Sequence, residues 1–218
     1  MADTPQVRSF PPEMFQRMDE SDDPLFYAFP RKVVHIDEPA IQAARQMIEA
    51  TFAPNGVLLD LLSSWRSHLP PGFVKQKLVG LGLNAEEMAD NPDLDEYVVQ
   101  DVNADPRLPF ADDSFDGAVI TVSIQYLTHP VEIFSEVRRV LKDGAPFLVL
   151  FSNRMFPTKA VRVWQALHPE QRIQLIHAYF QAAGGYEDPL FTDASPQTGI
   201  TDPLYAMCAR KRVVFTSP

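Results

Sequence analysis

Apolar residues along the chain fall into short runs separated by Pro, Gly, Asn and Asp, a pattern typical of alternating strands and helices. The run at 56–62 has the length and continuous apolarity of a buried strand, and further strands are predicted at 77–83, 96–102, 116–123 and 145–152. The tail at 204–215 predicts one or two more. The pattern therefore indicates a sheet whose central strands are covered on both faces.

Helical periodicity marks several of the segments between these strands. Asp37 or Glu38 can cap a helix that carries Pro39 in its first turn. Further helices are predicted at 85–90, 129–144, 158–167 and 169–183. The first crossover helix is expected within 63–73, where two consecutive prolines leave room for only about two turns.

Strands that alternate with helices predict an α/β fold with a mostly parallel sheet and helices on both faces. The fold class expected is Rossmann-like. Residues 1–36 are irregular and carry an acidic patch, so they form an N-terminal extension or lid. Residues 37–218 contain no repeat and no low-complexity linker, which favours a single domain.

The 218 residues include 19 Lys and Arg against 29 Asp and Glu, a net charge of −10, so a nucleic-acid partner is not expected. The basic run Arg210–Arg212 is interpreted as the end of a solvated edge strand. Cys208 is the single cysteine and is expected to be a buried structural thiol. No His, Cys and Asp set has metal-ligand spacing, and no apolar run reaches the ~18 residues of a membrane span. A cytoplasmic protein without a membrane partner is expected, and its oligomeric state is left open.

The stretch LVGLGLNAEE at 78–87 fits G-x-G-x-x-A, with Asp101 twenty-one residues after Gly80. This spacing is typical of a dinucleotide-binding turn, with the acid placed for a ribose. However, the turn follows the second strand rather than the first, and too little chain separates Ala85 from Pro92 for a crossover helix. The glycines are better interpreted as positions of close backbone approach, and an NAD-dependent oxidoreductase ranks last among the functions considered.

Residues 100–154 carry three features at related spacings: Asp101 ending the third strand, LPFADDSFD opening the fourth, and EVRRVLKDG in the helix before the fifth. This combination resembles the class I S-adenosylmethionine-dependent methyltransferases, most closely the methyltransferase type 11 group. The order of elements extends the resemblance over about residues 50–215. SSWRSH at 63–68 also looks like the loop of an uncharacterised methyltransferase-like family of cyanobacteria and plants.

The resemblance departs from the family pattern where the cofactor would lie. Asp60 keeps the acid that ends the first strand, but Leu62, Ser63 and Ser64 stand in place of the family's glycine-rich loop. The ribose-binding acid of the second strand is replaced by Gly82, with Asn84 two residues further on. Small serines still admit a ligand near the backbone, although Ser adopts positive φ less readily than Gly, so a different loop path is expected.

The resemblance implies a site for S-adenosylmethionine at the carboxyl ends of the strands. Its cofactor-binding candidates are Asp60, Ser63, Ser64, Trp65, Gly82, Asn84, Asp101, Val102 and Ser123. Its substrate-binding candidates are Tyr27, Arg31, Tyr126, Asn153 and Arg154. No catalytic residue is assigned, and His35 and Tyr126 are the candidate bases.

Structural roles compete with several of these assignments. Asp60 could cap a turn, Asp101 could be a solvated strand-end acid, and Trp65 could be a core anchor. Glu86 and Glu87 are interpreted as a solvated helix turn. The function expected is a methyltransferase acting on a small molecule, and the alternative is a non-catalytic ligand-binding protein on the same scaffold.

Overall fold

The computed structural model describes residues 10–213 of the chain. Seven strands form one sheet in the order β3-β2-β1-β4-β5-β7-β6, in which β7 runs antiparallel to both neighbours and the first five strands are parallel. The strands are β1 Val57–Leu61, β2 Lys77–Gly82, β3 Glu96–Val99, β4 Gly117–Thr121, β5 Pro146–Phe151, β6 Leu190–Asp193 and β7 Tyr205–Arg210. The expected α/β class with a mostly parallel sheet is confirmed.

Six α-helices and two 3-10 turns accompany the strands in the described part of the chain. The helices are α1 Asp23–Phe26, α2 Glu38–Thr51, α3 Ala85–Ala89, α4 Pro130–Val140, α5 Arg162–Ala166 and α6 Pro169–Ala183. The 3-10 turns are η1 Pro12–Phe15 and η2 Ile124–Tyr126. The predicted cap at Asp37 is confirmed, because its carboxylate accepts from the Ala40 N–H. Asn84 caps α3, since its amide oxygen accepts from the Glu87 N–H.

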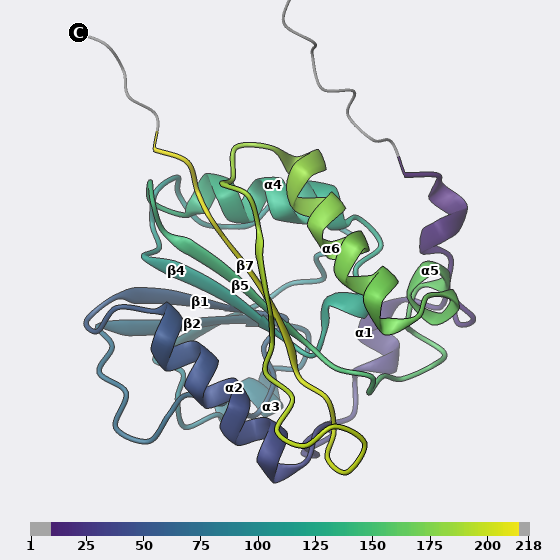
Figure 1. The fold of residues 1–218 in the computed structure, drawn as a ribbon, viewed down its shortest axis with the longest axis horizontal. Helices are drawn as coiled ribbons and strands as arrows, with labels where there is room; N and C mark the ends of the chain where they lie inside the picture. The colour runs from purple at the N-terminus through teal and green to yellow at the C-terminus, as the bar shows by residue number, and fades with distance from the viewer. Residues whose placement is uncertain (1–9, 214–218) are drawn as a thin grey trace, which may run out of the picture.

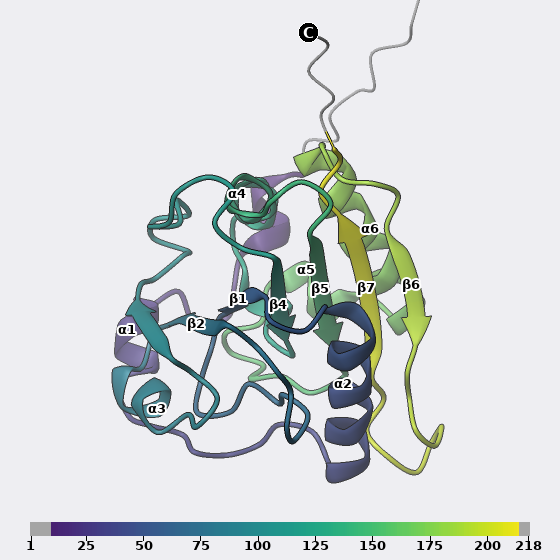
Figure 2. The ribbon, with the colours of Figure 1, turned by 90° about the vertical axis from the view of Figure 1, so that its left-hand side faces the viewer.

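The sheet lies between two helical layers, with α4 and α6 over one face and α2 over the other (Figures 1 and 2). Alternate strand residues face opposite layers, as the pleat of a strand requires. On β1, Leu59 and Leu61 belong to the core under α4 and α6, whereas Leu58 belongs to the core under α2. The continuous apolar runs of the sequence are therefore explained by burial on both faces.

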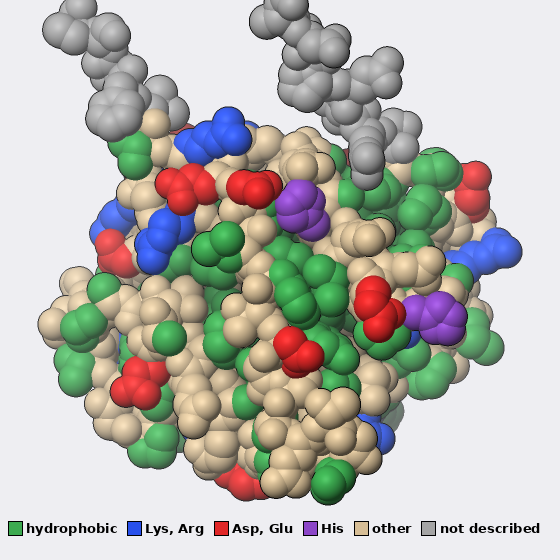
Figure 3. Space-filling model, viewed as in Figure 1, with side chains coloured by type: hydrophobic (Ala, Val, Ile, Leu, Met, Phe, Trp, Pro, Cys, Tyr) green, Lys and Arg blue, Asp and Glu red, His purple; other side chains and the backbone are tan. Residues whose placement is uncertain are grey.

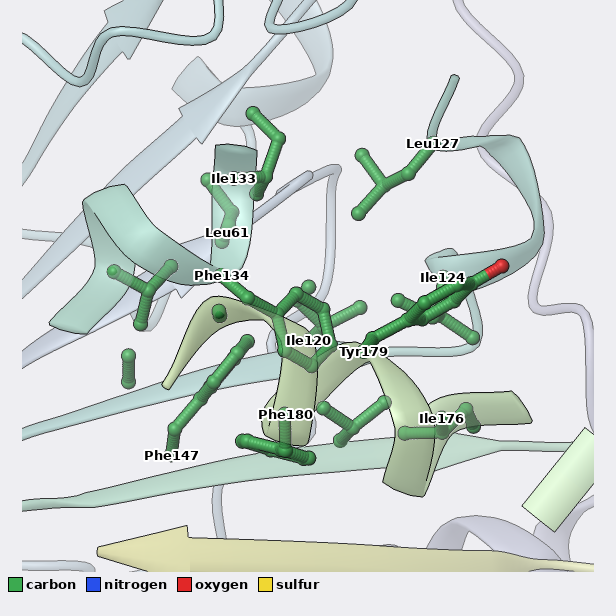
Figure 4. Packing of buried hydrophobic residues seen from close by; sticks show 14 of the residues in the cluster. Leu61, Ile120, Ile124, Leu127, Ile133, Phe134, Phe147, Ile176, Tyr179 and Phe180 are labelled. Carbon is green, nitrogen blue, oxygen red and sulfur yellow. The ribbon is translucent and has the colours of Figure 1, made fainter. Parts of the chain in front are cut away.

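The core under α4 and α6 is rich in aromatic rings (Figure 4). Phe134 of α4 packs edge-on against Phe147 of β5 and Phe180 of α6, at centroid distances of 4.9 and 4.7 Å. Tyr186, which follows α6, donates its hydroxyl to the Phe134 carbonyl at 2.7 Å. This packing fixes the two helices to the sheet and leaves the carboxyl ends of the parallel strands for other side chains.

Two expectations about the fold are wrong, and one strand was missed. No helix forms between β1 and β2, where a helix of about two turns was expected. The edge strand β6 was not predicted, because all four of its residues are exposed and give no apolar pattern. Consequently Arg210 ends an inner strand rather than an edge strand.

Among residues 10–213, no helix combines the length and the apolarity that a crossing of the bilayer requires. Figure 3 shows acidic and basic side chains interspersed on the face seen in Figure 1, without a broad field of one sign.

Candidate functional site

A cavity of about 140 Å³ lies over the carboxyl ends of the parallel strands. Its walls come from the N-terminal segment 23–36, the loop after β1, the end of β2 with α3, and the segments that follow β3, β4 and β5. Open parallel sheets bind ligands at this position, where the strand order reverses between β1 and β4. The cavity is thus where the fold predicts a site.

The loop after β1 is held by a buried carboxyl group. Asp60 is 3% exposed, and its Oδ2 accepts from the hydroxyls of Ser63 and Ser67, both at 2.6 Å. Asn91 donates in turn to the Ser67 hydroxyl and to the Ser64 carbonyl, both at 2.9 Å. Burial raises the pKa of Asp60 to about 6, although the two hydroxyl donors oppose the shift. These bonds replace a crossover helix with a compact loop.

Leu62 occupies the left-handed region at φ +60°, a conformation that glycine adopts without steric cost. The loop therefore begins with the backbone turn that a glycine would make, while Ser63 and Ser64 keep negative φ. A Cβ added at Gly82 would lie 2.2 Å from the Ser63 carbonyl oxygen. The predicted close backbone approach is confirmed at Gly82, whereas at Gly80 the Leu94 side chain fills the space. The contact at Gly82 explains why β2 carries no acid there.

Glu87 is buried, which corrects its interpretation as part of a solvated helix turn. Its side chain is 8% exposed and lines the cavity. One carboxylate oxygen accepts from the Ser64 hydroxyl at 2.6 Å and the other from the Arg31 backbone N–H at 2.5 Å. Glu86 is exposed, as expected, and pairs with Lys32 on the surface. Glu87 thus joins α3 to the loop after β1 and to the N-terminal segment.

Asn84 and Asp101 also use polar atoms within the protein. The Asn84 amide donates to the Tyr27 carbonyl at 2.8 Å, while its oxygen caps α3. Asp101 Oδ1 accepts from the N–H groups of Asn103 and Ala104. One oxygen of Asp101 therefore stabilises the turn after β3, which is a structural role. The residue also lines the cavity.

The N-terminal segment is fastened by a buried ion cluster. Asp23 is 4% exposed and accepts two bonds from the Arg17 guanidinium, at 2.6 and 2.8 Å. The fully buried Lys159 ammonium lies 3.2 Å from Asp23, and the Asn103 amide donates to the same carboxylate at 2.8 Å. These charge-assisted bonds hold residues 17–27 against the loops that follow β3 and β5.

Aromatic rings surround the guanidinium of Arg31. The guanidinium carbon lies 4.3 Å from the ring centroid of Phe26 and 5.6 Å from that of Phe156. The ring of Tyr126 stacks at 6.2 Å and 27° on Phe156, and the His35 ring meets Phe156 edge-on at 5.0 Å. Burial raises the pKa of Tyr126 and lowers that of His35. His35 is therefore a neutral imidazole near pH 7.

Most residues proposed from the sequence line this one cavity. They are Tyr27, Arg31, His35, Asp60, Ser63, Ser64, Trp65, Gly82, Asn84, Asp101, Val102, Ser123 and Tyr126. Asn153 and Arg154 are not among its lining residues, and the exposed Arg154 guanidinium pairs with Asp202 at 2.7 Å.

The lining residues that the sequence did not assign to the site include Glu87, Asn103, His68 and Phe156. Burial lowers the pKa of His68 to about 4, so its imidazole is neutral. Phe156 and Asn103 each lie just beyond a strand end, which was the available signal. Glu87 gave none, since an acid in a first helical turn is usually solvated.

A second, more open cleft of about 680 Å³ is lined by residues from the segments 10–23, 101–104 and 128–132. Asp23, Asp101 and Asn103 line both this cleft and the cavity. The hydrogen bond between Asn103 and Asp23 therefore forms part of the wall between the two spaces.

Residues 75–149 match the family model described as a methyltransferase domain. The chain is 33% identical over 145 residues to the demethylmenaquinone methyltransferase of Porphyromonas gingivalis, covering 58% of this chain and 56% of that protein. It is 37% identical over 81 residues to Methyltransferase phqN of Penicillium fellutanum, covering 34% of this chain and 25% of that protein. The chain thus spans between a quarter and just over half of the length of these curated relatives.

Solved structures share the fold at low sequence identity. A chain from the complex of the Haloferax volcanii Trm112 methyltransferase activator with a methyltransferase superposes with a TM-score of 0.60 at 16% identity, covering 83% of this chain and 92% of that one. The [4+2]-cyclase SpnF superposes with a TM-score of 0.59 at 18% identity, covering 80% of this chain and 81% of that one. Phosphoethanolamine N-methyltransferase 2 of Haemonchus contortus was solved with S-adenosyl-L-methionine. It superposes with a TM-score of 0.55 at 14% identity, covering 79% of this chain and 52% of that one.

The expected resemblance is confirmed for the domain and for the fold, while the narrower likeness carried by the SSWRSH loop stays a prediction. The sheet order, the crossover pattern and the matched segment agree with one another. Residues 75–149 therefore match a methyltransferase domain, and the chain has the fold of the solved methyltransferases.

Proposed function

We propose that this protein is an S-adenosylmethionine-dependent methyltransferase that acts on a small organic molecule. The observation that carries the proposal is the cavity over the carboxyl ends of β1, β2 and β4, lined by residues of the matched segment 75–149. The relatives named as methyltransferases support it. The fold alone does not, because the same scaffold also occurs in a cyclase.

The cofactor would lie across the ends of the parallel strands. Asp101 and the Val102 backbone would contact the adenine, and Ser63, Ser64 and Trp65 would face the methionine end, where hydroxyls can serve both carboxylate and ammonium. Gly82 cannot carry the usual ribose-binding acid, because the Ser63 carbonyl fills the space of its side chain. Glu87 is the cavity-lining carboxylate closest in sequence to that position and would take over contact with the ribose.

When bound, S-adenosylmethionine supplies an electrophilic methyl group. The residues of this chain would contribute mainly by positioning the acceptor in line with that group and by excluding water. Where the acceptor nucleophile carries a proton, His35 is suited to remove it, because its imidazole is unprotonated near neutral pH. Tyr126 is the other candidate, although its raised pKa makes it a donor rather than a base at that pH.

Residues 1–36 would act as a lid over the domain formed by 37–218, and residues 1–9 lie outside the described residues. A cavity of about 140 Å³ is smaller than the ~300–1,000 Å³ typical of ligand sites, so a ligand of cofactor size requires the walls to move. The N-terminal segment is the wall that contains no strand of the sheet and lies outside the parallel βα units. Release of Asp23 from Asn103 would join the cavity to the second cleft.

Calorimetric titration of the purified protein with S-adenosylmethionine, S-adenosylhomocysteine and NAD tests the proposal. Saturable binding of the first two in the micromolar range, without binding of NAD, is the expected result. Absence of binding by both sulfur compounds to a folded protein would contradict it and would favour a ligand-binding protein on a methyltransferase scaffold. Binding of NAD alone would restore the dinucleotide interpretation of the glycines at 80–82.

A further inference from the structure

Arg31 presents an unsatisfied cation to the cavity. Its guanidinium is packed among the rings of Phe26, Tyr27 and Phe156, at 4.3, 5.8 and 5.6 Å from their centroids. Its Nη1 is buried and has no hydrogen-bond partner. Within residues 10–213, no carboxylate forms an ion pair with this guanidinium.

The acids of the cavity wall accept from donors other than the Arg31 guanidinium, and Asp101 accepts from two backbone N–H groups. Asp23 pairs with Arg17 and Lys159, and Asp60 accepts from two serine hydroxyls. Glu87 accepts from the Ser64 hydroxyl and from the backbone N–H of Arg31, not from its side chain. A buried donor on a charged group without an acceptor is costly, and a ligand that supplies the acceptor recovers that cost.

The chemistry of the missing acceptor follows from the shape of the site. Rings that pack against a guanidinium leave its N–H groups directed outward in its plane, in a fork that matches the two oxygens of a carboxylate. Tyr126 and Phe156, stacked on one another at 6.2 Å, follow β4 and β5 and offer an apolar wall beside the fork. The site thus suits a carboxylate attached to an apolar or flat group.

We propose that Arg31 recognises a carboxylate on the ligand that fills this cavity. The role of Arg31 does not depend on the proposed function. Only the identity of the molecule that carries the carboxylate does. Under that function, the source is either the methionine end of the cofactor or a methyl acceptor that is an organic acid. Either source would bring a carboxylate to the Arg31 guanidinium, and matched pairs of probe ligands distinguish the two sources.

The test uses two pairs of probes that differ in the carboxylate. S-Adenosylhomocysteine is compared with 5′-methylthioadenosine, which lacks the amino-acid end, and benzoate is compared with benzamide. Each is titrated calorimetrically into the wild type, Arg31→Met, Arg31→Lys and Lys32→Met. Lys32→Met is the matched control, because it removes one positive charge from the neighbouring residue, which pairs with Glu86 and Asp90 on the surface outside the cavity lining.

The wild type is expected to prefer the carboxylate member of at least one pair by about tenfold or more, as charge-assisted hydrogen bonds to a planar fork imply. Arg31→Met removes that preference, Arg31→Lys retains part of it, and Lys32→Met leaves it intact. The pair that responds identifies the source. Methionine keeps the apolar packing among the rings, and thermal unfolding of each variant verifies the fold.

Two results overturn the inference: a wild type that shows no preference within either pair, or an Arg31→Met variant that retains it. These results differ from failure of the proposed function, in which the wild type binds neither adenosyl compound. In that case the benzoate pair still upholds or overturns the role of Arg31.

Discussion

The half of the molecule built on β4, α4 and β5 and the half built on β1, β2 and α3 meet at one cavity, but they use their polar residues differently. In the first half, the Arg139 guanidinium donates to the carbonyls of Leu108 and Phe110 and pairs with Glu136 and Asp112. The LPFADDSFD turn and the EVRRVLKDG helix are thus held together by direct bonds. None of these residues lines the cavity.

In the second half, polar side chains gather at the cavity itself. Ser63 and Ser67 bind Asp60, and Ser64 binds Glu87. The comparison shows that the LPFADDSFD turn and the EVRRVLKDG helix stabilise the fold away from the cavity, whereas Asp101 lines it. The loop at the site could therefore be rebuilt as a network of internal hydrogen bonds without any change in strand order.

Gly82→Ala should produce the largest effect, since its Cβ would lie 2.2 Å from the Ser63 carbonyl oxygen on a loop that cannot give way. We expect the free energy of unfolding in urea to fall by about 4 kcal/mol. Gly72→Ala is the control: its φ is +79°, nothing lies within 4 Å of the added Cβ, and it should cost about 1 kcal/mol. Equal costs for the two variants would mean that the loop does not press on β2.

The pH dependence of stability should reveal the buried carboxyl of Asp60. Its pKa is about 6 in the folded protein and near 3.8 in the unfolded chain, so the native state holds the proton more tightly. Its contribution is complete below about pH 4 and declines as the pH rises through 6, by about 3 kcal/mol in total. Urea unfolding of the wild type should show this decline relative to Asp60→Asn. Parallel pH profiles for the two proteins would contradict the raised pKa.

Arg139→Met should lower the free energy of unfolding by about 2 kcal/mol, because two backbone carbonyls and two carboxylates lose their donor. The affinity for S-adenosylhomocysteine should stay within about twofold of the wild type once the protein is folded. Urea unfolding and calorimetry together measure both effects. A large loss of affinity with little loss of stability would place this half of the molecule in the site and weaken the comparison.

Asp101→Ala should have the smallest effect, a loss of about 1–2 kcal/mol in the binding of S-adenosylhomocysteine. One oxygen of Asp101 caps the turn after β3, so part of the loss would come from a looser turn. Asp101→Asn separates the two contributions, because its amide oxygen keeps the cap and removes the charge. Wild-type affinity in a folded Asp101→Ala variant would remove this residue from the site.

Strands β1, β2, β4 and β5 could be predicted because they are buried on both faces and give mostly apolar runs, as in VLLDL of β1. The exposed β6 gave no such signal. The helix predicted after β1 does not form, for a different reason. The side chains of Ser63, Ser64 and Ser67 donate to Asp60 and Glu87 and hold the segment as a loop.

Much of the cavity could be anticipated because parallel strands end at one edge of a sheet, which brings Asp60, Asp101 and Ser123 together. The role of Glu87 could not be anticipated from the sequence, since its partners Ser64 and Arg31 lie 23 and 56 residues away in the chain. Arg154 was assigned to the site by its strand end, but it pairs with Asp202, 48 residues away. Local sequence therefore indicates where a strand ends but not which partner its side chain takes.

Hydrogen exchange with and without saturating S-adenosylhomocysteine tests most directly whether the cavity is the cofactor site. We expect slower exchange at 62–68, 82–87 and 100–103, which line the cavity, and altered exchange in the N-terminal segment 23–36 that covers it. The turn at 108–114, which is held by Arg139, should not change. Protection that is absent from the cavity segments, or confined to other parts of the sheet, would contradict the account.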